Sequence, residues 1–400
     1  MSLLAEIVES ARAVASFCVS VPWMYPFAKA RRGPQEPWVI GGHRGRIRAD
    51  NSEALHDYLL ERGAEEVVFI AGNPELLDRL RARGVPALAR HSLAARWAIL
   101  KAPVLIYSHG EDDLDICQIL LRGRVGLRVF LNHSMNYLKA GQHYRPDIDS
   151  LRGIRRWLFD WLVTDFDVLL ASSPREKRYF ELSYPGREDD ILLGGGAHID
   201  AFMRSRDCPE RRTIVYFPTF RDDARGRRLL HETLRGLTEH AALREWLREH
   251  EYRLLIGSHI NTGGLALHLP ERFVWMPPAD VKDRLFECRL FISDYSGLIF
   301  DYLALGKPIA LFPFDMDNYL RTRCLYSDYQ DIAYGPVVWS LEELVALIVS
   351  GRWEELAPFE DARQRLRADV FPSLEPRYAR SSYEAIRSLA ARHDPVGRGI

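Results

Sequence analysis

The turn at residues 294–297 is the part of the sequence whose residue types best suit chemistry. An apolar strand ends at Asp294, a Tyr-Ser-Gly turn follows, and a helix begins at Leu298. Ser296 and Gly297 therefore lie at a helix N-terminus, where unpaired N–H groups and the helix dipole favour a phosphate. Gly297 also lets a ligand approach the backbone closely. We interpret the turn as an anion site; the alternative is an ordinary helix cap formed by Ser296 or Asp294.

Two histidines follow predicted strands, one in each half of the chain: His133 in FLNHSMNYLKAG and His259 in LLIGSHINTG. An imidazole titrates near neutrality and can act as a general base. A histidine from each half, meeting across a cleft, would suit proton transfer together with stabilisation of phosphate charge. Ser134 and Lys139 are close enough in sequence to His133 to reach the same phosphate. The chain has 13 histidines, and the alternative is that His133 only caps its loop while Lys139 is solvated on a helix.

A polar loop, PTFRDD, follows a further strand at residues 218–223. Thr219, Arg221 and Asp222 are its candidate ligand-binding residues. Arg suits paired hydrogen bonds with a phosphate, and Asp222 could orient a ligand hydroxyl or a histidine. The alternative is a solvated charged loop.

The composition and charge of the chain exclude some classes of function. The 400 residues are 47% apolar and 27% charged, with a formal net charge of −1. This balance is typical of a globular protein of two domains and gives no general attraction for nucleic acid. Five scattered cysteines without a CxxC pair argue against a disulfide framework and a zinc ribbon. We expect a reducing compartment, no metal, no cofactor and no nucleic-acid partner.

Short apolar strands alternate with helices along the chain and would position these residues. In the first half, strands are predicted at 38–42, 66–72, 103–109, 127–133, 167–173 and 190–196, and helices at 52–62, 74–83 and 151–162. In the second half, strands are predicted at 213–220, 252–259, 272–277, 290–296, 308–315 and 336–339, and helices at 229–249, 280–287, 298–305 and 340–348. Near-continuous apolar strands indicate parallel sheets covered on both faces, and the alternation indicates doubly wound α/β domains.

The domain prediction follows from this alternation of strands and helices. We predict two Rossmann-like α/β domains, residues 36–204 and 205–375, facing a cleft, with the charged stretch 201–212 as their connection. Residues 376–400 carry a last helix that is a candidate to cross back to the first domain. Ligands bind at the carboxyl ends of the strands in open α/β sheets, which is where the candidate residues lie.

Residues 1–35 are predicted to form an amphipathic helix. One face collects Leu4, Ile7, Val8, Ala11, Val14, Ala15 and Cys18, and Trp23, Tyr25, Phe27, Lys29, Arg31 and Arg32 follow. Charged residues interrupt the segment and a basic n-region is lacking, so neither a signal peptide nor a spanning helix is expected. The pattern fits a helix lying in a membrane interface; the alternative is a helix packed on its own domain or on a second subunit.

Three segments in the second half, YFPTFRDD, GSHINTG and ISDYSGLIFDYLALGKPIALFPFDMDNY, resemble in their order the CDP-glycerol glycerophosphotransferase family, which includes primases and polymerases of teichoic acid synthesis and related capsule polymerases. The matching residues are Pro218, Thr219, Arg221, Asp222, His259, Asp294, Tyr295, Ser296, Phe300, Asp301 and Tyr302. In the first half, Gly45, Asp50 and Asn51 are similar to the family's Gly–…–Asp-Asn-Ser segment. Asn132-His133 with Leu138-Lys139 resembles its Trp-His-Gly-Thr-Pro-Leu-Lys motif. The resemblance covers most of residues 38–320.

The resemblance implies a GT-B architecture, with the nucleotide held mainly by the second domain and the acceptor by the first. It implies an enzyme that moves glycerol phosphate, or another polyol phosphate, from a CDP-linked donor to a hydroxyl of a lipid-linked or polymeric acceptor and releases CMP, without a dedicated metal. His133 would take the acceptor proton, while His259, Arg221 and the turn at Ser296 would stabilise charge on the pyrophosphate. Asp50, Asn51, Ser134 and Lys139 would lie on the acceptor side. We expect a cytoplasmic protein, peripheral on the inner face of the cell membrane if its first helix makes contact.

Three departures from the family pattern lie around the expected site. Gly297 stands where the turn usually has a second Ser, and Ser134-Met135-Asn136 replaces Gly-Thr-Pro after the histidine. In LGGGAHIDAF (193–202), Asp200 matches the family's Gly-x-Pro-Arg-x-Asp segment but the Arg is missing. The reaction class is retained, and the donor and acceptor stay open. Two other functions also stay open: a GT-B glycosyltransferase that uses a nucleotide sugar, and a non-catalytic nucleotide-binding scaffold.

Overall fold

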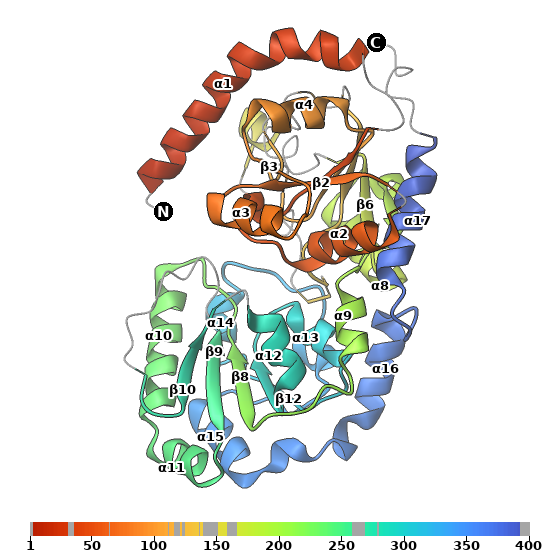
Figure 1. Ribbon diagram of the computed structural model, residues 1–400. Coiled ribbons are helices and arrows are strands. Elements are labelled where there is room, and N and C mark those ends of the chain that lie inside the picture. The colour runs from red at the N-terminus through yellow and green to blue at the C-terminus, as the bar shows by residue number, and fades with distance from the viewer. Residues whose placement is uncertain are drawn as a thin grey trace.

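The computed structural model describes residues 3–30, 36–63, 65–110, 112–115, 121, 125–135, 137–138, 151–157, 166–257, 269–277 and 280–392, with the side chains of residues 3–12 left aside. Its described strands form two parallel sheets, one above the other in Figure 1. This confirms the predicted α/β class with two doubly wound units.

The first sheet has seven strands in the order β3-β2-β1-β4-β5-β6-β7. They are β1 (Trp38–Ile40), β2 (Val67–Ala71), β3 (Ala87–Ala89), β4 (Val104–Tyr107), β5 (Leu127–Phe130), β6 (Val168–Ala171) and β7 (Ile191–Leu193). Helices α2 (Asp50–Arg62), α3 (Pro74–Ala82), α4 (Leu93–Lys101) and α8 (Pro174–Ser183) connect them. Strand β4 is buried on both faces, with Leu105 and Tyr107 in one apolar core and Val104 and Ile106 in the other. That two-sided burial explains its continuous apolar sequence.

The second sheet has five strands in the order β10-β9-β8-β11-β12. They are β8 (Thr213–Phe217), β9 (Arg253–Gly257), β10 (Phe273–Met276), β11 (Leu290–Ser293) and β12 (Ile309–Leu311). The helices of this half are α9 (Ile199–Arg204), α10 (Ala224–Glu239), α11 (Ala241–Glu249), α12 (Val281–Glu287), α13 (Leu298–Leu303), α14 (Met316–Tyr319) and α15 (Leu341–Ser350).

Most predicted elements are confirmed, and the exceptions have local causes. The three-residue edge strand β3 was not predicted because it is too short to show a pattern. The predicted helix 229–249 is two helices, because His240 is extended (φ −65°, ψ 114°) between α10 and α11. The predicted strand 336–339 reduces to one bridge between Val337 and Leu311. Of the predicted helix 151–162, residues 153–157 are helical and 158–162 lie outside the described residues.

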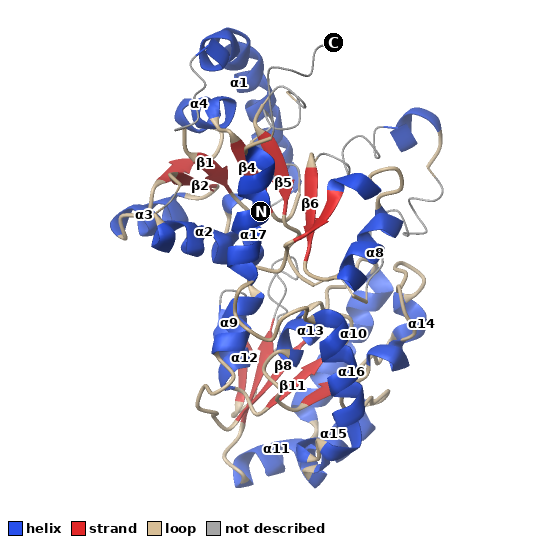
Figure 2. Cartoon of the chain, turned by 90° about the vertical axis from the view of Figure 1, so that its right-hand side faces the viewer, coloured by secondary structure: helices blue, strands red, loops and turns tan. Residues whose placement is uncertain are grey.

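The end of the chain returns to the first sheet. Helix α16 (Glu360–Val370) lies beside α13, and α17 (Tyr378–Ala390) packs on α2 (Figure 2). The ring of Tyr383 lies 6.0 Å from that of Trp38 on β1. Asp200 accepts hydrogen bonds from the first two N–H groups of α17, at 2.8 and 3.1 Å. Carboxylates at helix N-termini are stabilising, so this contact fixes where α17 begins.

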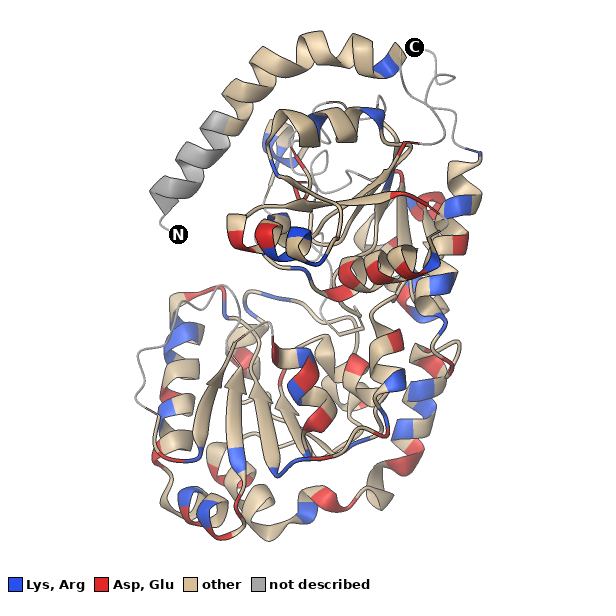
Figure 3. Ribbon diagram, viewed as in Figure 1, with Lys and Arg blue, Asp and Glu red and all other residues tan. Residues whose placement is uncertain are grey.

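Helix α1 (Leu3–Ala30) packs on α4 through one face and leaves another exposed. The buried guanidinium of Arg96 donates to the hydroxyls of Ser16 and Ser20 and to the carbonyl of Ala13. Val21, Met24 and Ala28 are buried beside that contact. In Figure 3, residues 13–30 of the helix carry charge only near the C-terminal end. Among the described residues, no helix is long and apolar enough to cross a membrane.

Candidate functional site

Three histidines come together at the carboxyl edge of the first sheet. His43, His109 and His133 follow β1, β4 and β5, which are neighbours in the parallel sheet, so their loops emerge side by side. The ring centroids of His43 and His109 lie 3.2 Å apart, and those of His109 and His133 lie 4.5 Å apart in a stack. Of the three, only His133 was predicted as catalytic from the sequence. Their shared position after a strand is the signal that could have selected the other two.

Asp50 places a carboxylate among these histidines. Its Oδ2 lies 2.9 Å from Nε2 of His43 and 3.6 Å from Nε2 of His109. Burial acts to raise the pKa of Asp50, but the hydrogen bond with His43 and the charges of His43, His133 and His198 outweigh it and hold that pKa below its ordinary value. Asp50 is therefore ionised at neutral pH.

Two of these residues adopt left-handed backbone conformations that are uncommon outside glycine, with φ of 50° at His43 and 60° at Asp50. Such strain persists where the surrounding structure imposes it, often at functional sites. The ligand-type atoms of His43, Asp50 and His109 all lie within 4.8 Å of one another, so these three residues could hold a metal ion. The expectation of a site without a metal stays a prediction.

Asn51 holds the loop that carries His133. Its Nδ2 donates to the carbonyl oxygens of Leu131 at 3.2 Å and Asn132 at 2.9 Å. Asn132 in turn donates from its own side chain to the carbonyl of Ser134 at 2.7 Å. The backbone is thus fixed on both sides of His133, whose side chain is exposed. Asn51 is buried and acts on the loop itself, whereas Ser134 lies beside His133 at the surface of the site.

The predicted phosphate turn follows β11, and Thr219 follows the neighbouring strand β8. The buried carboxylate of Asp294 accepts hydrogen bonds from the N–H groups of Thr219 at 2.8 Å and Tyr295 at 2.6 Å. The hydroxyl of Ser296 accepts from the N–H of Leu298 at 3.3 Å. The N-cap residue of α13 is Gly297, which makes no side-chain capping hydrogen bond. Anion binding at the turn stays a prediction.

The direct phosphate contact predicted for Arg221 is corrected by the structure, because this side chain is only 1% exposed. Its guanidinium donates to Asp315 through Nε and Nη2, both at 2.7 Å, to Asp294 at 2.8 Å, and to the carbonyl of Thr219. Three aromatic rings surround it, with centroids 5.1 to 5.4 Å from Cζ: Tyr295, Phe314 and Tyr319. A cation held this way braces the loop after β8 against β11 and has no face open to a ligand.

Asp222 also has a different partner from the one predicted. It accepts from Nε and Nη2 of Arg323 at 2.6 and 3.0 Å. In the described part of the chain it does not orient a histidine. His259 and Lys139 lie outside the described residues, so their predicted roles stay predictions.

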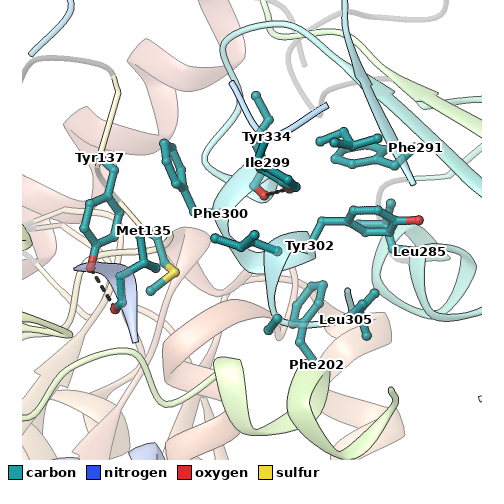
Figure 4. Packing of buried hydrophobic residues seen from close by; sticks show 14 of the residues in the cluster. Met135, Tyr137, Phe202, Leu285, Phe291, Ile299, Phe300, Tyr302, Leu305 and Tyr334 are labelled. Atoms are coloured by element: carbon teal, nitrogen blue, oxygen red, sulfur yellow. Dashed lines mark hydrogen bonds between the residues drawn. The ribbon is translucent and has the colours of Figure 1, made fainter. Parts of the chain in front are cut away.

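The two halves of the predicted site meet at Gly297. A Cβ atom there would lie 2.7 Å from the carbonyl oxygen of Met135 and 2.9 Å from the hydroxyl oxygen of Ser134. Two of the departures from the family pattern, at 297 and after His133, therefore touch each other. Apolar packing continues from this contact, with the rings of Tyr137 and Phe300 5.1 Å apart (Figure 4).

Known proteins resemble the chain over most of its length. A family model described as CDP-glycerol:poly(glycerophosphate) glycerophosphotransferase matches residues 40–381. The teichoic acid ribitol-phosphate polymerase TarK of Staphylococcus aureus is 27% identical over 267 residues, which are 60% of this chain and 50% of TarK. The teichoic acid poly(glycerol phosphate) polymerase of Bacillus subtilis is 22% identical over 349 residues, which are 80% of this chain and 45% of that protein. The chain thus spans half or less of the length of these relatives.

Solved structures show the same fold. The wall teichoic acid polymerase TagF matches with a TM-score of 0.69 at 16% identity, over 98% of this chain and 99% of that chain. A TagF variant soaked with CDPG matches with a TM-score of 0.70 at 15% identity, over the same shares of the two chains. The likeness confirms the predicted GT-B architecture.

Proposed function

The chain belongs to the CDP-glycerol:poly(glycerophosphate) glycerophosphotransferase family, and on this premise we propose that it transfers a polyol phosphate from a CDP-linked donor to an acceptor hydroxyl and releases CMP. The product would be a cell-envelope polymer of the teichoic acid or capsule type. Related proteins are teichoic acid polymerases, and one TagF variant was soaked with CDPG. One observation carries the proposal: the loop of His133 on the first sheet touches the turn at Ser296 on the second.

The residues can be assigned to the steps of such a transfer. His133 accepts the proton of the acceptor hydroxyl, the hydroxyl oxygen bonds to the phosphorus nearer the polyol, and the P–O bond to CMP breaks with its electron pair leaving on CMP. Asp50 stabilises positive charge among the stacked histidines. Phosphoryl transfer depends mainly on positioning and charge neutralisation, which we assign to the turn at Ser296, to Thr219 and to His259.

The proposal is tested by incubating the full chain with CDP-glycerol, CDP-ribitol or UDP-sugars, together with a glycerol-phosphate-primed lipid acceptor. CMP release that depends on the acceptor supports the proposal, and the donor that is consumed identifies the polyol. UDP release would show a glycosyltransferase instead. Tight CDP-glycerol binding with no product on any acceptor would show a non-catalytic scaffold. A chelator arm tests the proposal that no metal takes part, for which an unchanged rate is expected.

Substituting Gly297 with Ser, which restores the usual family residue, is expected to lower activity in this chain. The new Cβ would lie within 3.0 Å of backbone in the loop after His133, so the loop or the turn must move. Displacement of reacting groups by about 1 Å can cost roughly 100-fold in rate, and we expect a loss of about 10-fold to 100-fold in kcat. Steady-state assays of CMP release measure it. Gly236→Ala is the matched control, because its Cβ would meet only the flexible end of Leu341; equal activities in the two variants would contradict this expectation.

Contact with a membrane through α1 is part of the proposal and is supported by the exposed face of this helix. Val19, Trp23 and Phe27 recur every four residues and are 76%, 55% and 59% exposed. Val14, Ala15 and Cys18, members of the apolar face predicted from the sequence, are exposed as well. A lipid-linked acceptor at the inner face of the cell membrane would suit this arrangement.

The double variant Trp23→Glu/Phe27→Glu is expected to reduce binding to vesicles that contain anionic lipid. Two aromatic anchors are lost and two negative charges are added, so the partition coefficient should fall by at least about 10-fold. Co-sedimentation with vesicles measures it. Trp339→Glu, at an exposed tryptophan of the second half (44% exposed), is the control and should bind as the wild type does. Point variants are preferable to deletion of residues 1–32, which would remove the partners of Arg96. Unchanged binding of the double variant would rule out contact through this stripe.

A further inference from the structure

His198 is a buried histidine that the steps above do not use, and it lies between the two sheets. It precedes α9 and is about 5% exposed. One ring nitrogen, Nδ1, lies 2.6 Å from Oδ1 of Asn51 on α2. The other, Nε2, lies 2.8 Å from Oδ1 of Asp301 on α13. The imidazole therefore spans the helix that orders the His133 loop and the helix that follows the turn at Ser296.

The hydrogen bonds of Asn51 determine which atoms donate. Nδ2 of Asn51 points at two carbonyl oxygens, those of Leu131 and Asn132, which can only accept. Its Oδ1 must then face His198, where it also accepts from the backbone N–H of that residue at 3.1 Å. A flipped amide would set oxygen against two oxygens, so the orientation is fixed.

Both ring nitrogens of His198 therefore face acceptors. Nδ1 meets an amide oxygen that cannot donate, and Nε2 meets the carboxylate of Asp301, which also accepts when ionised. A neutral imidazole has one N–H and could satisfy only one of these contacts. With Asp301 ionised, only the doubly protonated ring satisfies both contacts, and the hydrogen bond to Asp301 is then charge-assisted.

The charges around the ring agree with this protonation. Four acidic groups interact with His198 from the described elements packed around it: Asp301 on α13, Asp50 on α2, Glu176 on α8 and Asp200 on α9. Burial by itself would lower the pKa of His198, but Asp301, through its charge and hydrogen bond, and then Asp50 and Glu176 raise it above the ordinary value of 6.5.

We propose that His198 is held as an imidazolium that ties Asn51 to Asp301 across the two domains, and so positions the loop of His133 relative to the turn at Ser296. It is a positioning residue, since its contacts reach the reacting groups only through Asn51 and α13. Asp200 aligns with the last residue of the Gly-x-Pro-Arg-x-Asp pattern, so His198 occupies the place of the missing Arg and supplies a cation that can titrate. The effect on catalysis rests on the proposed function; the protonation state does not.

The protonation state is tested by nuclear magnetic resonance on the full chain labelled with nitrogen-15 histidine. His198→Gln identifies the signals of His198 by their loss, and His231→Gln on α10 is the control. Two protonated ring nitrogens are expected at neutral pH, both persisting as pH rises above the ordinary titration range of histidine. A single ring N–H at neutral pH would overturn the proposal, whatever the enzyme assays give.

The positioning role is tested by the pH dependence of CMP release. A histidine with a raised pKa keeps its proton below that pKa and loses it as pH rises through it, so wild-type kcat should fall on the alkaline side. His198→Arg carries a permanent cation, and its alkaline limb should move to higher pH. His198→Gln is expected to lower kcat by about 10-fold to 100-fold, with a smaller change in the KM for CDP-glycerol.

The outcomes separate the two proposals. Wild-type kcat and an unshifted alkaline limb in both variants would overturn the positioning role while leaving the transferase function intact. Absence of CMP release from the wild type would reject the transferase function, and the resonance test of His198 would still stand. If His198→Arg does not fold, Asp301→Asn serves as the second variant: it removes the counter-charge, so its alkaline limb should move to lower pH, and an unmoved limb would count against the proposal.

Discussion

Replacing His133 with Ala is expected to lower the rate of CMP release by about 100-fold to 10,000-fold, the contribution typical of a positioned general base. The side chain is exposed at the carboxyl edge of the first sheet, and its ring makes a stack with His109. The backbone of its loop is held by the side chains of Asn51 and Asn132. Removing the ring should therefore remove chemistry while leaving the loop in place.

Three measurements distinguish a loss of proton transfer from a loss of folding or of donor binding. The thermal midpoint of His133→Ala should match that of the wild type, and its affinity for CDP-glycerol should change little, so that the loss lies in kcat. His231→Ala on α10 is a matched histidine control and should keep full activity. His109→Ala distinguishes the members of the stack: the proton acceptor is the residue whose loss removes the acid limb of the pH profile of kcat. Undiminished turnover of His133→Ala would show that another group accepts the proton.

Replacing Arg221 with Met is expected to destabilise the second domain by about 3–5 kcal/mol, as when one partner of a buried ion pair is removed. Asp294 and Asp315 would be left buried without their cation, at side-chain exposures of 0% and 1%. A shift of about 2–4 °C per kcal/mol is usual for a domain of this size, so the thermal midpoint should fall by roughly 6–20 °C. Arg221→Lys should also be destabilising, because an ammonium cannot reproduce the paired contacts.

A control variant and a triple variant test whether Arg221 supports the fold or binds the ligand. Arg228→Met, at an exposed position on α10, is the control and should change the free energy of unfolding by less than about 0.5 kcal/mol. The triple variant Arg221→Met/Asp294→Asn/Asp315→Asn should recover part of the loss, because the orphaned charges are gone. If Arg221→Met instead unfolds at the wild-type temperature but has a raised KM for CDP-glycerol, the direct phosphate contact first predicted for this residue would be restored.

The residues at which this chain departs from the family pattern contact one another or link the two domains. Gly297 and the Ser134-Met135 pair are adjacent, so a Cβ atom at position 297 would meet the hydroxyl of Ser134 and the carbonyl of Met135. His198 takes the position of an absent Arg and contacts both domains. We therefore expect these substitutions to act as sets, with non-additive effects when they are exchanged one at a time.

The sequence by itself determined most of the elements and the family. Buried parallel strands such as β4 carry continuous apolar runs, and the capping residue Ser340 marks the start of α15, because these signals depend on neighbours a few residues away. The order of the PTFRDD loop and the SDYSG turn was enough to identify the family that the matched residues 40–381 bear out. Short elements such as β3 were missed because three residues show no periodicity.

Only the tertiary structure decided which side chains meet. Arg221 was predicted to bind a phosphate, but Asp294 and Asp315, 73 and 94 residues away in sequence, enclose it. The sequence did not indicate His198 as a functional residue, because its hydrogen-bond partner Asn51 is 147 residues away in the chain. A histidine or an arginine has the same local pattern whether it contacts a ligand or a buried carboxylate. Its partners are set by strand order and by the docking of the two sheets, and these depend on long-range packing that no local spacing encodes.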